Sequence, residues 1–355
     1  MISIMVDYIV VGTGLAGIAF TEKLAQEGKT FVVIDGETRS SSLIAGGMYN
    51  PVVLKRFTDV WKVKEQLALA EVFYPALEAK LQVKCWFPMD LYRRLASIEE
   101  QNNWFQAADR PNLTAFLSPE IVKMQRDGVD LSFGLGKVKA TGYLETDALI
   151  PAYRRYLAQL GCYKKETFDY SLLTYHEDGI AYKGIEAQHI VFAEGFGLLQ
   201  NPFFKELPLD GTKGELLIVK IPGLKCDFML KAGVFLIPIG EDKYKLGATY
   251  NWEDKTDKPT QEGKDELIDG LKSFIDLDFE IVEHIAGIRP TVKDRRPLLG
   301  RSLESDRIFV LNGLGTRGVL LAPYLAEQLY NYIENNVALD ENISIHRYKK
   351  FKLKK

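Results

Sequence analysis

Cysteine, histidine and long apolar runs are scarce in this sequence, and each scarcity excludes a kind of site or segment. The 355 residues include three cysteines, Cys85, Cys162 and Cys226, which lie far apart and show no CxxC spacing. The sequence therefore predicts neither a disulfide framework nor a zinc site, and we expect a reducing, cytoplasmic location. The four histidines are scattered as well, so we expect no metal centre.

Membrane and export segments are not expected either. No stretch of about 18 apolar residues runs without a charge, which argues against a transmembrane helix. Asp7 interrupts the apolar N-terminus and no basic residue precedes it, so we interpret this segment as a buried strand and not as a signal peptide. The net charge of -3 gives no overall attraction for nucleic acid, and only a local basic patch would provide one.

The length of the chain favours two subdomains, since a single core stops growing at roughly 250–300 residues. Residues 8–11 form an apolar, β-branched run, and apolar positions recur at helical spacing over residues 15–27, followed by Gly28 as a helix-ending glycine. A second strand is expected over residues 30–34. Strand, glycine turn, helix and strand within about 30 residues predict one right-handed βαβ unit.

The turn between the first strand and the first helix has the dinucleotide-binding pattern GxGxxG. It reads Gly12-Thr13-Gly14-Leu15-Ala16-Gly17, and Asp35 follows Gly17 by 18 residues at the end of the second strand. Glycines at these places allow a tight turn and close approach of a pyrophosphate, and an acidic side chain accepts hydrogen bonds from a ribose diol. The pattern predicts an adenine dinucleotide without a 2′-phosphate and leaves FAD and NAD as alternatives.

Two further segments rich in small residues decide between these cofactors. Residues 41–48 follow Asp35 closely, and residues 313–318 place a glycine turn before the last predicted helix. Backbone of this kind can pass close to a flat ring or a phosphate, although a plain surface loop is the alternative for residues 41–48. Arg317 in the second segment is suited to stabilising the electron-rich edge of a flavin.

At these residues the sequence resembles the D-amino-acid oxidase superfamily of FAD-dependent oxidoreductases, with glycine oxidase and sarcosine oxidase among its members. The segments that resemble it are VDYIVVGTGLAGIAF with Asp35, SSSLIAGGMYNP, HIVFAEGFG, KGELLIV, GIRPTVKDRRPLLG and NGLGTRGVLLAPYLAEQL. The resemblance implies an α/β fold, with a discontinuous Rossmann-like FAD-binding domain and a second, antiparallel-sheet (α+β) substrate domain. The expected FAD-binding domain comprises residues 1–50, 137–200 and 286–355, and the substrate domain residues 51–136 and 201–285.

The resemblance also implies a set of noncovalent FAD contacts. They are Gly12, Gly14, Leu15, Ala16, Gly17, Asp35 and Gly36 in the first segment, Ser41, Ser42, Ala45, Gly46, Gly47 and Met48 in the second, Phe168 and Gly195 in the middle of the chain, and Gly313, Leu314, Gly315, Thr316, Arg317, Gly318, Val319 and Leu320 near the end.

Three residues are implied in catalysis, namely Arg289, Tyr250 and Arg317. Arg289 in GIRP matches the arginine that holds a substrate carboxylate, and an ion pair of Arg289 with Asp294 is the structural alternative. Tyr250, at the end of the predicted strand over residues 244–250, can donate its hydroxyl to the same carboxylate or pack in the core. Lys213 either passes the flavin face or is solvated.

The identity of the substrate stays open, because the motif of residues 313–318 departs from the glycine-oxidase pattern. That pattern has its arginine where this chain has Thr316 and an asparagine where Arg317 stands. The form GLGTRG with APYLAE behind it is more similar to the oxidoreductase module of the bifunctional enzyme that matures aminomethyl-uridine in tRNA.

Three hypotheses follow from the motifs and the resemblance. The first is oxidation of the C–N bond of a small amine, amino acid or N-substituted glycine, with oxygen or another electron acceptor. The second is oxidative removal of a carboxymethyl group from a tRNA wobble uridine, which predicts a basic rim around the pocket. The third is a non-catalytic FAD-binding subunit.

Overall fold

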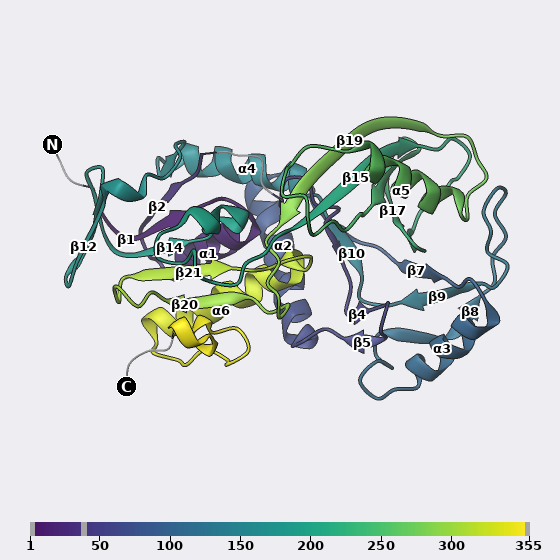
Figure 1. Ribbon diagram of the computed structural model, residues 1–355, viewed down its shortest axis with the longest axis horizontal. Helices are drawn as coiled ribbons and strands as arrows, with labels where there is room; N and C mark the ends of the chain where they lie inside the picture. Colours follow the sequence, from purple (N-terminus) through teal and green to yellow (C-terminus); the bar gives the residue numbers. More distant parts are fainter. Residues whose placement is uncertain (1–3, 37–40, 352–355) are drawn as a thin grey trace.

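Two large β-sheets organise the chain in the computed structural model, which describes residues 4–36 and 41–351. Figure 1 shows one sheet with its helices on the left, where both ends of the chain lie, and the second sheet on the right. Parts of the expected domain ranges, residues 1–3, 37–40 and 352–355, lie outside the described residues. None of the described helices is long and apolar enough to cross a membrane.

The first sheet has a parallel centre assembled from three distant parts of the chain. Strand β1 (Ile4–Val11) pairs in parallel with β2 (Phe31–Ile34) and with β14 (Ile185–Phe192), and β14 pairs in parallel with β21 (Ile308–Asn312). Residues 8–11 are buried, as the sequence predicts for a central strand. The α/β class and the discontinuous cofactor sheet are thereby confirmed. The remaining strands of this sheet are β11 (Tyr163–Lys164), β12 (Leu173–His176), β13 (Gly179–Tyr182) and β20 (Leu298–Arg301).

Helices α1 (Leu15–Gln26) and α6 (Gly318–Glu334) pack against each other along this sheet, and α2 (Val63–Leu81) packs against α6. The amino ends of α1 and α6 meet, because a Cβ placed on Gly318 would lie 3.3 Å from Leu15 Cδ1. The Tyr74 hydroxyl of α2 donates to the Val319 carbonyl at 2.7 Å. Helix α4 (Thr146–Gln159) contacts both α1 and α2.

The second sheet is antiparallel apart from one strand pair. Its strand order is β19 (Glu280–Arg289), β15 (Thr212–Lys220), β18 (Lys243–Gly247), β17 (Phe235–Gly240), β16 (Met229–Lys231), β7 (Leu91–Arg94), β9 (Leu135–Val138) and β8 (Leu117–Val122), with β16 and β7 parallel. Helix α5 (Gln261–Lys272) packs on β15 and β18, and α3 (Ile98–Ala108) packs on β8.

The remaining elements are short. They are β3 (Met48–Tyr49), β10 (Gly142–Leu144) and β6 (Trp86–Pro88) in one sheet, β4 (Val52–Val53) with β5 (Thr58–Asp59), and the 3-10 helices η1 (Tyr170–Leu172), η2 (Gly195–Gln200), η3 (Ile345–Arg347) and η4 (Lys349–Phe351).

One predicted strand is too long. The sequence predicts a strand over residues 244–250, whereas β18 ends at Gly247. The reason is a change of partner, since Asn251 exchanges main-chain hydrogen bonds with Lys213 of β15 instead. Tyr250 therefore stands in a loop and not at a strand end.

Candidate active site

The glycine turn lies where β1 meets α1, and its glycines are sterically required. Gly12 has a φ of +103°, and a Cβ there would lie 2.5 Å from the Ala193 carbonyl oxygen. A Cβ on Gly17 would lie 1.9 Å from the Gly12 carbonyl oxygen. Side chains at these two positions would push the turn away from β14 and from the helix, so the close helix–strand packing predicted for Gly17 is present.

The adjoining amino ends of α1 and α6 form a region suited to a negatively charged group. Neither helix has an acidic residue in its first turn, and in the described chain no side chain of the N-cap residues Gly14 and Arg317 caps them. The first-turn amides thus point their partial positive charge to the same side. The Ser42 hydroxyl accepts a long hydrogen bond from the Leu15 amide at 3.4 Å, which brings the second predicted cofactor loop to this end of α1.

Asp35 lies beside the turn in a polar cluster. Its carboxylate accepts hydrogen bonds from the Thr13 amide at 2.6 Å and from the Thr13 hydroxyl. Arg154 of α4 lies 3.3 Å from the same oxygen and donates to the Thr13 hydroxyl at 2.7 Å. Sequence reasoning missed Arg154, because it stands 119 residues from Asp35 and belongs to no motif.

The second cofactor loop packs closely against its surroundings. Gly47 has a φ of +70°, and a Cβ there would lie 1.9 Å from the Leu144 carbonyl oxygen. A Cβ on Gly46 would lie 2.8 Å from the Phe235 ring. The loop therefore passes between the two sheets, and Met48 begins β3. Ser41 and Ala45 flank these contacts in the same segment.

Phe168 and Gly36 meet near the far end of the expected nucleotide site. The Phe168 ring is buried and stacked on Tyr182 with centroids 4.3 Å apart, so only its main chain is placed to contact a ligand. A Cβ on Gly36 would lie 2.7 Å from the Thr167 hydroxyl. Gly195, with a φ of +58°, accepts a hydrogen bond on its carbonyl from Asn312 at 3.0 Å.

The segment before α6 is joined to the GIRP segment. The Gly315 amide donates to the Pro290 carbonyl at 3.1 Å. Gly313 and Gly315 have φ values of +75° and +56°, so the turn uses the freedom of glycine. Thr316 is exposed, whereas the side chains of Leu314, Val319 and Leu320 are buried in the core.

A pair of glycines leaves bare backbone on the face of the second sheet. Gly214 of β15 and Gly287 of β19 are direct cross-strand partners. Ile44 of the second cofactor loop lies over Gly287, where a Cβ would be 1.8 Å from Ile44 Cδ1, and the Arg289 guanidinium lies over Gly214. Glycine within strands marks a place where a ligand or another group approaches the backbone closely.

The three predicted catalytic residues converge beside this glycine pair. The Arg289 guanidinium donates to the Lys213 and Thr249 carbonyls at 3.3 and 3.2 Å and stacks 4.5 Å from the centroid of the Tyr250 ring. The Tyr250 side chain is 54% exposed, so the hypothesis of core packing is wrong. Burial lowers the pKa values of Arg289 and Arg317, and the electrostatic interaction of each arginine with Tyr250 opposes the shift.

Neither arginine is neutralised by a carboxylate of the described residues. Asp294, the alternative partner of Arg289, binds Arg347 at 2.9 Å and the Tyr348 hydroxyl at 2.6 Å, so that alternative is wrong. Within residues 4–36 and 41–351, no carboxylate pairs with Arg289 or Arg317. Two partly buried cations thus face one site, where an anionic ligand would gain charge-assisted hydrogen bonds.

Glu194 lies directly behind the glycine turn and was not singled out by any motif. Its Cα lies 3.6 Å from the position of a Gly12 Cβ, and its carboxyl accepts hydrogen bonds from Tyr170 at 2.5 Å and Asn201 at 2.8 Å. Burial raises the pKa of Glu194 from 4.5 to about 7, against the effect of both hydrogen bonds.

This shift makes the stability of the protein pH-dependent. The pKa of Glu194 in the folded state, about 7, exceeds its ordinary value of 4.5. The contribution of Glu194 to the unfolding free energy is therefore largest below pH 4.5. It falls as the pH rises from 4.5 to 7 and stays constant above pH 7. We expect Glu194→Gln to unfold at a higher temperature than the wild type at pH 8, with a much smaller difference at pH 5. An equal difference at both pH values would contradict this assignment.

The residues present fit FAD. The glycine turn, two uncapped helix ends, the carboxylate of Asp35 and the sheet glycines beside Arg289 are linked by contacts between the sheets. Fold and site together define a flavin-dependent oxidoreductase. The family model "FAD dependent oxidoreductase" matches residues 7–331, and the chain belongs to this family.

Known proteins resemble the chain over almost its whole length. Glycine oxidase of Bacillus licheniformis is 26% identical, with 93% of each chain covered. The tRNA 5-methylaminomethyl-2-thiouridine biosynthesis bifunctional protein MnmC of Marinobacter nauticus is 24% identical over 92% of this chain and 55% of its own length. The crystal structure of glycine oxidase from Geobacillus kaustophilus has a TM-score of 0.80 at 19% identity, covering 98% of this chain and 100% of that one. This structural likeness confirms the fold.

Proposed function

We propose that the protein oxidises the C–N bond of a small amine that carries a carboxylate, such as an amino acid or an N-substituted glycine. The observation that supports this most directly is the unneutralised Arg289 guanidinium beside Tyr250, over the bare backbone of Gly214. A carboxylate bound there would hold the adjoining carbon at a fixed distance from the cofactor. The glycine oxidase relatives are named for a substrate of this kind.

The residues of the site would position the substrate relative to the cofactor. FAD, when bound, would supply the acceptor for a hydride from the carbon next to the amine. Arg289 would hold the carboxylate through two charge-assisted hydrogen bonds, and the Tyr250 hydroxyl would donate a third. The neutral amine needs no dedicated base, and His284, which lies behind the site, contacts Glu215 at 2.8 Å. Arg317, at the amino end of α6, would stabilise negative charge that develops on the cofactor.

The test is an anaerobic screen of the FAD-loaded protein. Glycine, sarcosine, iminodiacetate and larger N-substituted glycines are mixed with it, and the loss of oxidised-flavin absorbance is followed over time. We expect at least one carboxylated amine to bleach the flavin, and its decarboxylated counterpart, such as methylamine for glycine, to react far more slowly. A flavin that no amine reduces would favour the non-catalytic hypothesis instead.

A second candidate is the removal of a carboxymethyl group from a wobble uridine in tRNA. The observation that favours it is the basic loop that follows Arg289. Arg295 stacks on Trp252 at 4.9 Å and Arg296 on Trp61 at 5.6 Å, which puts two guanidinium–indole pairs at residues flanking the site. Such groups bind phosphates and single-stranded bases. The MnmC relative supports this candidate too, although this chain spans about half its length.

A comparison of substrates distinguishes the two candidates. Under the tRNA hypothesis, tRNA isolated from cells that lack the final maturation step bleaches the flavin at micromolar concentration, and salt suppresses the reaction steeply. Bleaching by sarcosine or glycine but not by such tRNA would contradict the second candidate. The basic loop would then be an ordinary solvated surface.

A further inference from the structure

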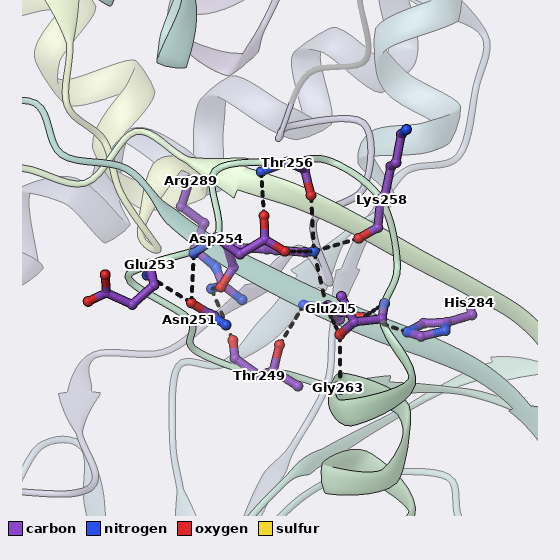
Figure 2. Close-up of polar contacts among 12 residues, drawn as sticks. Glu215, Thr249, Asn251, Glu253, Asp254, Thr256, Lys258, Gly263, His284 and Arg289 are labelled. Carbon is purple, nitrogen blue, oxygen red and sulfur yellow. Dashed lines mark hydrogen bonds and ion pairs between the residues drawn. The ribbon is translucent and has the colours of Figure 1, made fainter.

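A buried polar cluster lies directly behind Arg289, and Figure 2 shows it. At its centre is Lys213, whose side chain is fully buried at the start of β15. Its ammonium group donates to the carboxylate of Asp254 and to the carbonyl of Lys258, with Thr256 at 3.4 Å. The alternative that Lys213 is solvated is therefore wrong. All of these partners come from the loop of residues 250–260, which begins with Tyr250 and ends at the N-cap of α5.

The beginning of this loop is also tied to Lys213 through the main chain. The Lys213 amide donates to the Asn251 carbonyl at 2.9 Å, and the Asn251 amide donates back to the Lys213 carbonyl at 3.1 Å. The Asn251 side chain then accepts from the amides of Glu253 and Asp254 at 2.8 and 2.9 Å. The residue after Tyr250 and the residue that binds the Lys213 ammonium thus belong to one compact turn.

The same backbone holds Arg289 from the other side. Its guanidinium donates to the carbonyls of Lys213 and Thr249, the residue just before Tyr250. A movement of the loop would therefore shift the Tyr250 ring, and with it one of the two carbonyls that orient the arginine. In this way the two groups proposed to bind a carboxylate share a single support.

The charge of Lys213 is balanced mainly by the loop. The other nearby carboxylate, that of Glu215, lies 3.5 Å from the ammonium and is already bound by the amide and hydroxyl of Thr260 at 2.9 and 2.7 Å. Asp254 is the closer partner, and the hydrogen bond from Lys213 lowers its pKa to about 2. Without Asp254 the buried ammonium would keep only the more distant carboxylate of Glu215, which His284 also contacts at 2.8 Å. A poorly balanced buried charge is costly, so the ion pair favours the observed position of the loop over Lys213.

We infer that the ion pair of Lys213 with Asp254 is a positioning device that holds the loop of residues 250–260 so that Tyr250 and Arg289 form the carboxylate site in advance of binding. The inference rests on the proposed function, because it assigns these two residues a role in holding a carboxylate. Lys213 and Asp254 touch neither the substrate nor the cofactor in this scheme. They act through Tyr250 and Arg289, and a pre-formed site binds its ligand more tightly than one that must be ordered.

The test uses FAD-loaded protein and acetate, a carboxylate that cannot be oxidised. Asp254→Asn removes the charge from the loop side of the pair, where the side chain is 26% exposed, so it perturbs the interior less than a change of Lys213. Asp257→Asn is the matched control, since Asp257 is an exposed residue of the same loop. The dissociation constant of acetate is measured from the perturbation of the flavin spectrum at constant ionic strength, and hydrogen exchange is measured over residues 249–260.

We expect Asp254→Asn to weaken acetate binding about tenfold, to raise exchange across the loop, and to leave the flavin content unchanged, with Asp257→Asn equal to wild type. The double variant Lys213→Met with Asp254→Asn should still bind acetate weakly, because no ion pair holds the loop in place. Recovery of wild-type affinity in the double variant would overturn the inference, since the defect would then arise from an unpaired lysine alone.

Two other outcomes separate the inference from the proposed function. Unchanged acetate affinity in Asp254→Asn, with or without faster exchange, overturns the positioning role and leaves the carboxylate site intact. If acetate does not perturb the wild-type flavin and no carboxylated amine bleaches it, the proposed function fails, and the positioning role fails with it. A loss of stability with no change in affinity would assign the pair to folding only.

Discussion

Arg289→Ala leaves FAD bound and lowers kcat/KM for a carboxylated amine by about 100- to 1000-fold, mostly through a higher KM. The physical reason is that the guanidinium is partly buried, lacks a carboxylate partner within the described chain, and under the proposed function would donate the charge-assisted hydrogen bonds to the substrate carboxylate. Its removal leaves a substrate carboxylate desolvated and unpaired. The initial rate of anaerobic flavin reduction, measured against substrate concentration, gives both constants.

The control for this variant is Arg155→Ala on α4, which removes an exposed arginine and should leave both constants unchanged. The kcat/KM of Tyr250→Phe should lie between the values of these two variants, because the substitution removes one hydrogen bond worth about 1–2 kcal/mol. Normal kinetics for Arg289→Ala would remove the arginine from the site, and a loss of flavin would show that it supports the cofactor instead.

Gly17→Val abolishes retention of FAD. A Cβ at this position would lie 1.9 Å from the Gly12 carbonyl oxygen, so α1 must move away from the turn at which the pyrophosphate is predicted to bind. We expect purified protein without the flavin absorbance bands and an affinity reduced more than about 100-fold. Added FAD should raise the melting temperature of the wild type and leave that of the variant unchanged, since a ligand stabilises only the state that binds it.

Gly28→Asn is the matched control for the glycine turn. Gly28 has a φ of +70° with no atom within 4 Å of a Cβ, and asparagine tolerates this conformation. Wild-type flavin content is expected there. Flavin loss in both variants would indicate general instability of α1, whereas full occupancy in Gly17→Val would contradict the position of the cofactor.

The cofactor half of the molecule could be predicted from local sequence because each feature is a property of neighbouring residues. A buried run, a glycine turn, an amphipathic helix and Asp35 occur within one βαβ unit, and β1, α1 and β2 lie where expected. Arg289 was found through the family resemblance and Tyr250 through its place at the end of a predicted strand, and the structure stacks the two 4.5 Å apart. The domain limits and the roles of individual cofactor residues stay predictions.

Residues that act through distant partners could not be predicted in this way. Arg154 reaches Asp35 from α4, and Lys213 is buried only because the loop of residues 250–260 folds over it. Glu194 is perturbed by burial behind the turn. In each case the deciding contact joins segments that share no periodicity or motif, so a single sequence offers no signal for the pairing.

The order of strands in the first sheet has a consequence for biosynthesis. Strand β21 pairs with the carboxyl half of β14, and α6 covers α1 and α2, yet both elements are synthesised more than 280 residues after α1. Until then the nascent chain exposes part of one edge of β14 and one uncovered side of α1. Stabilisation of the sheet by a flavin that contacts the amino end of α6 can therefore begin only after that helix has been made.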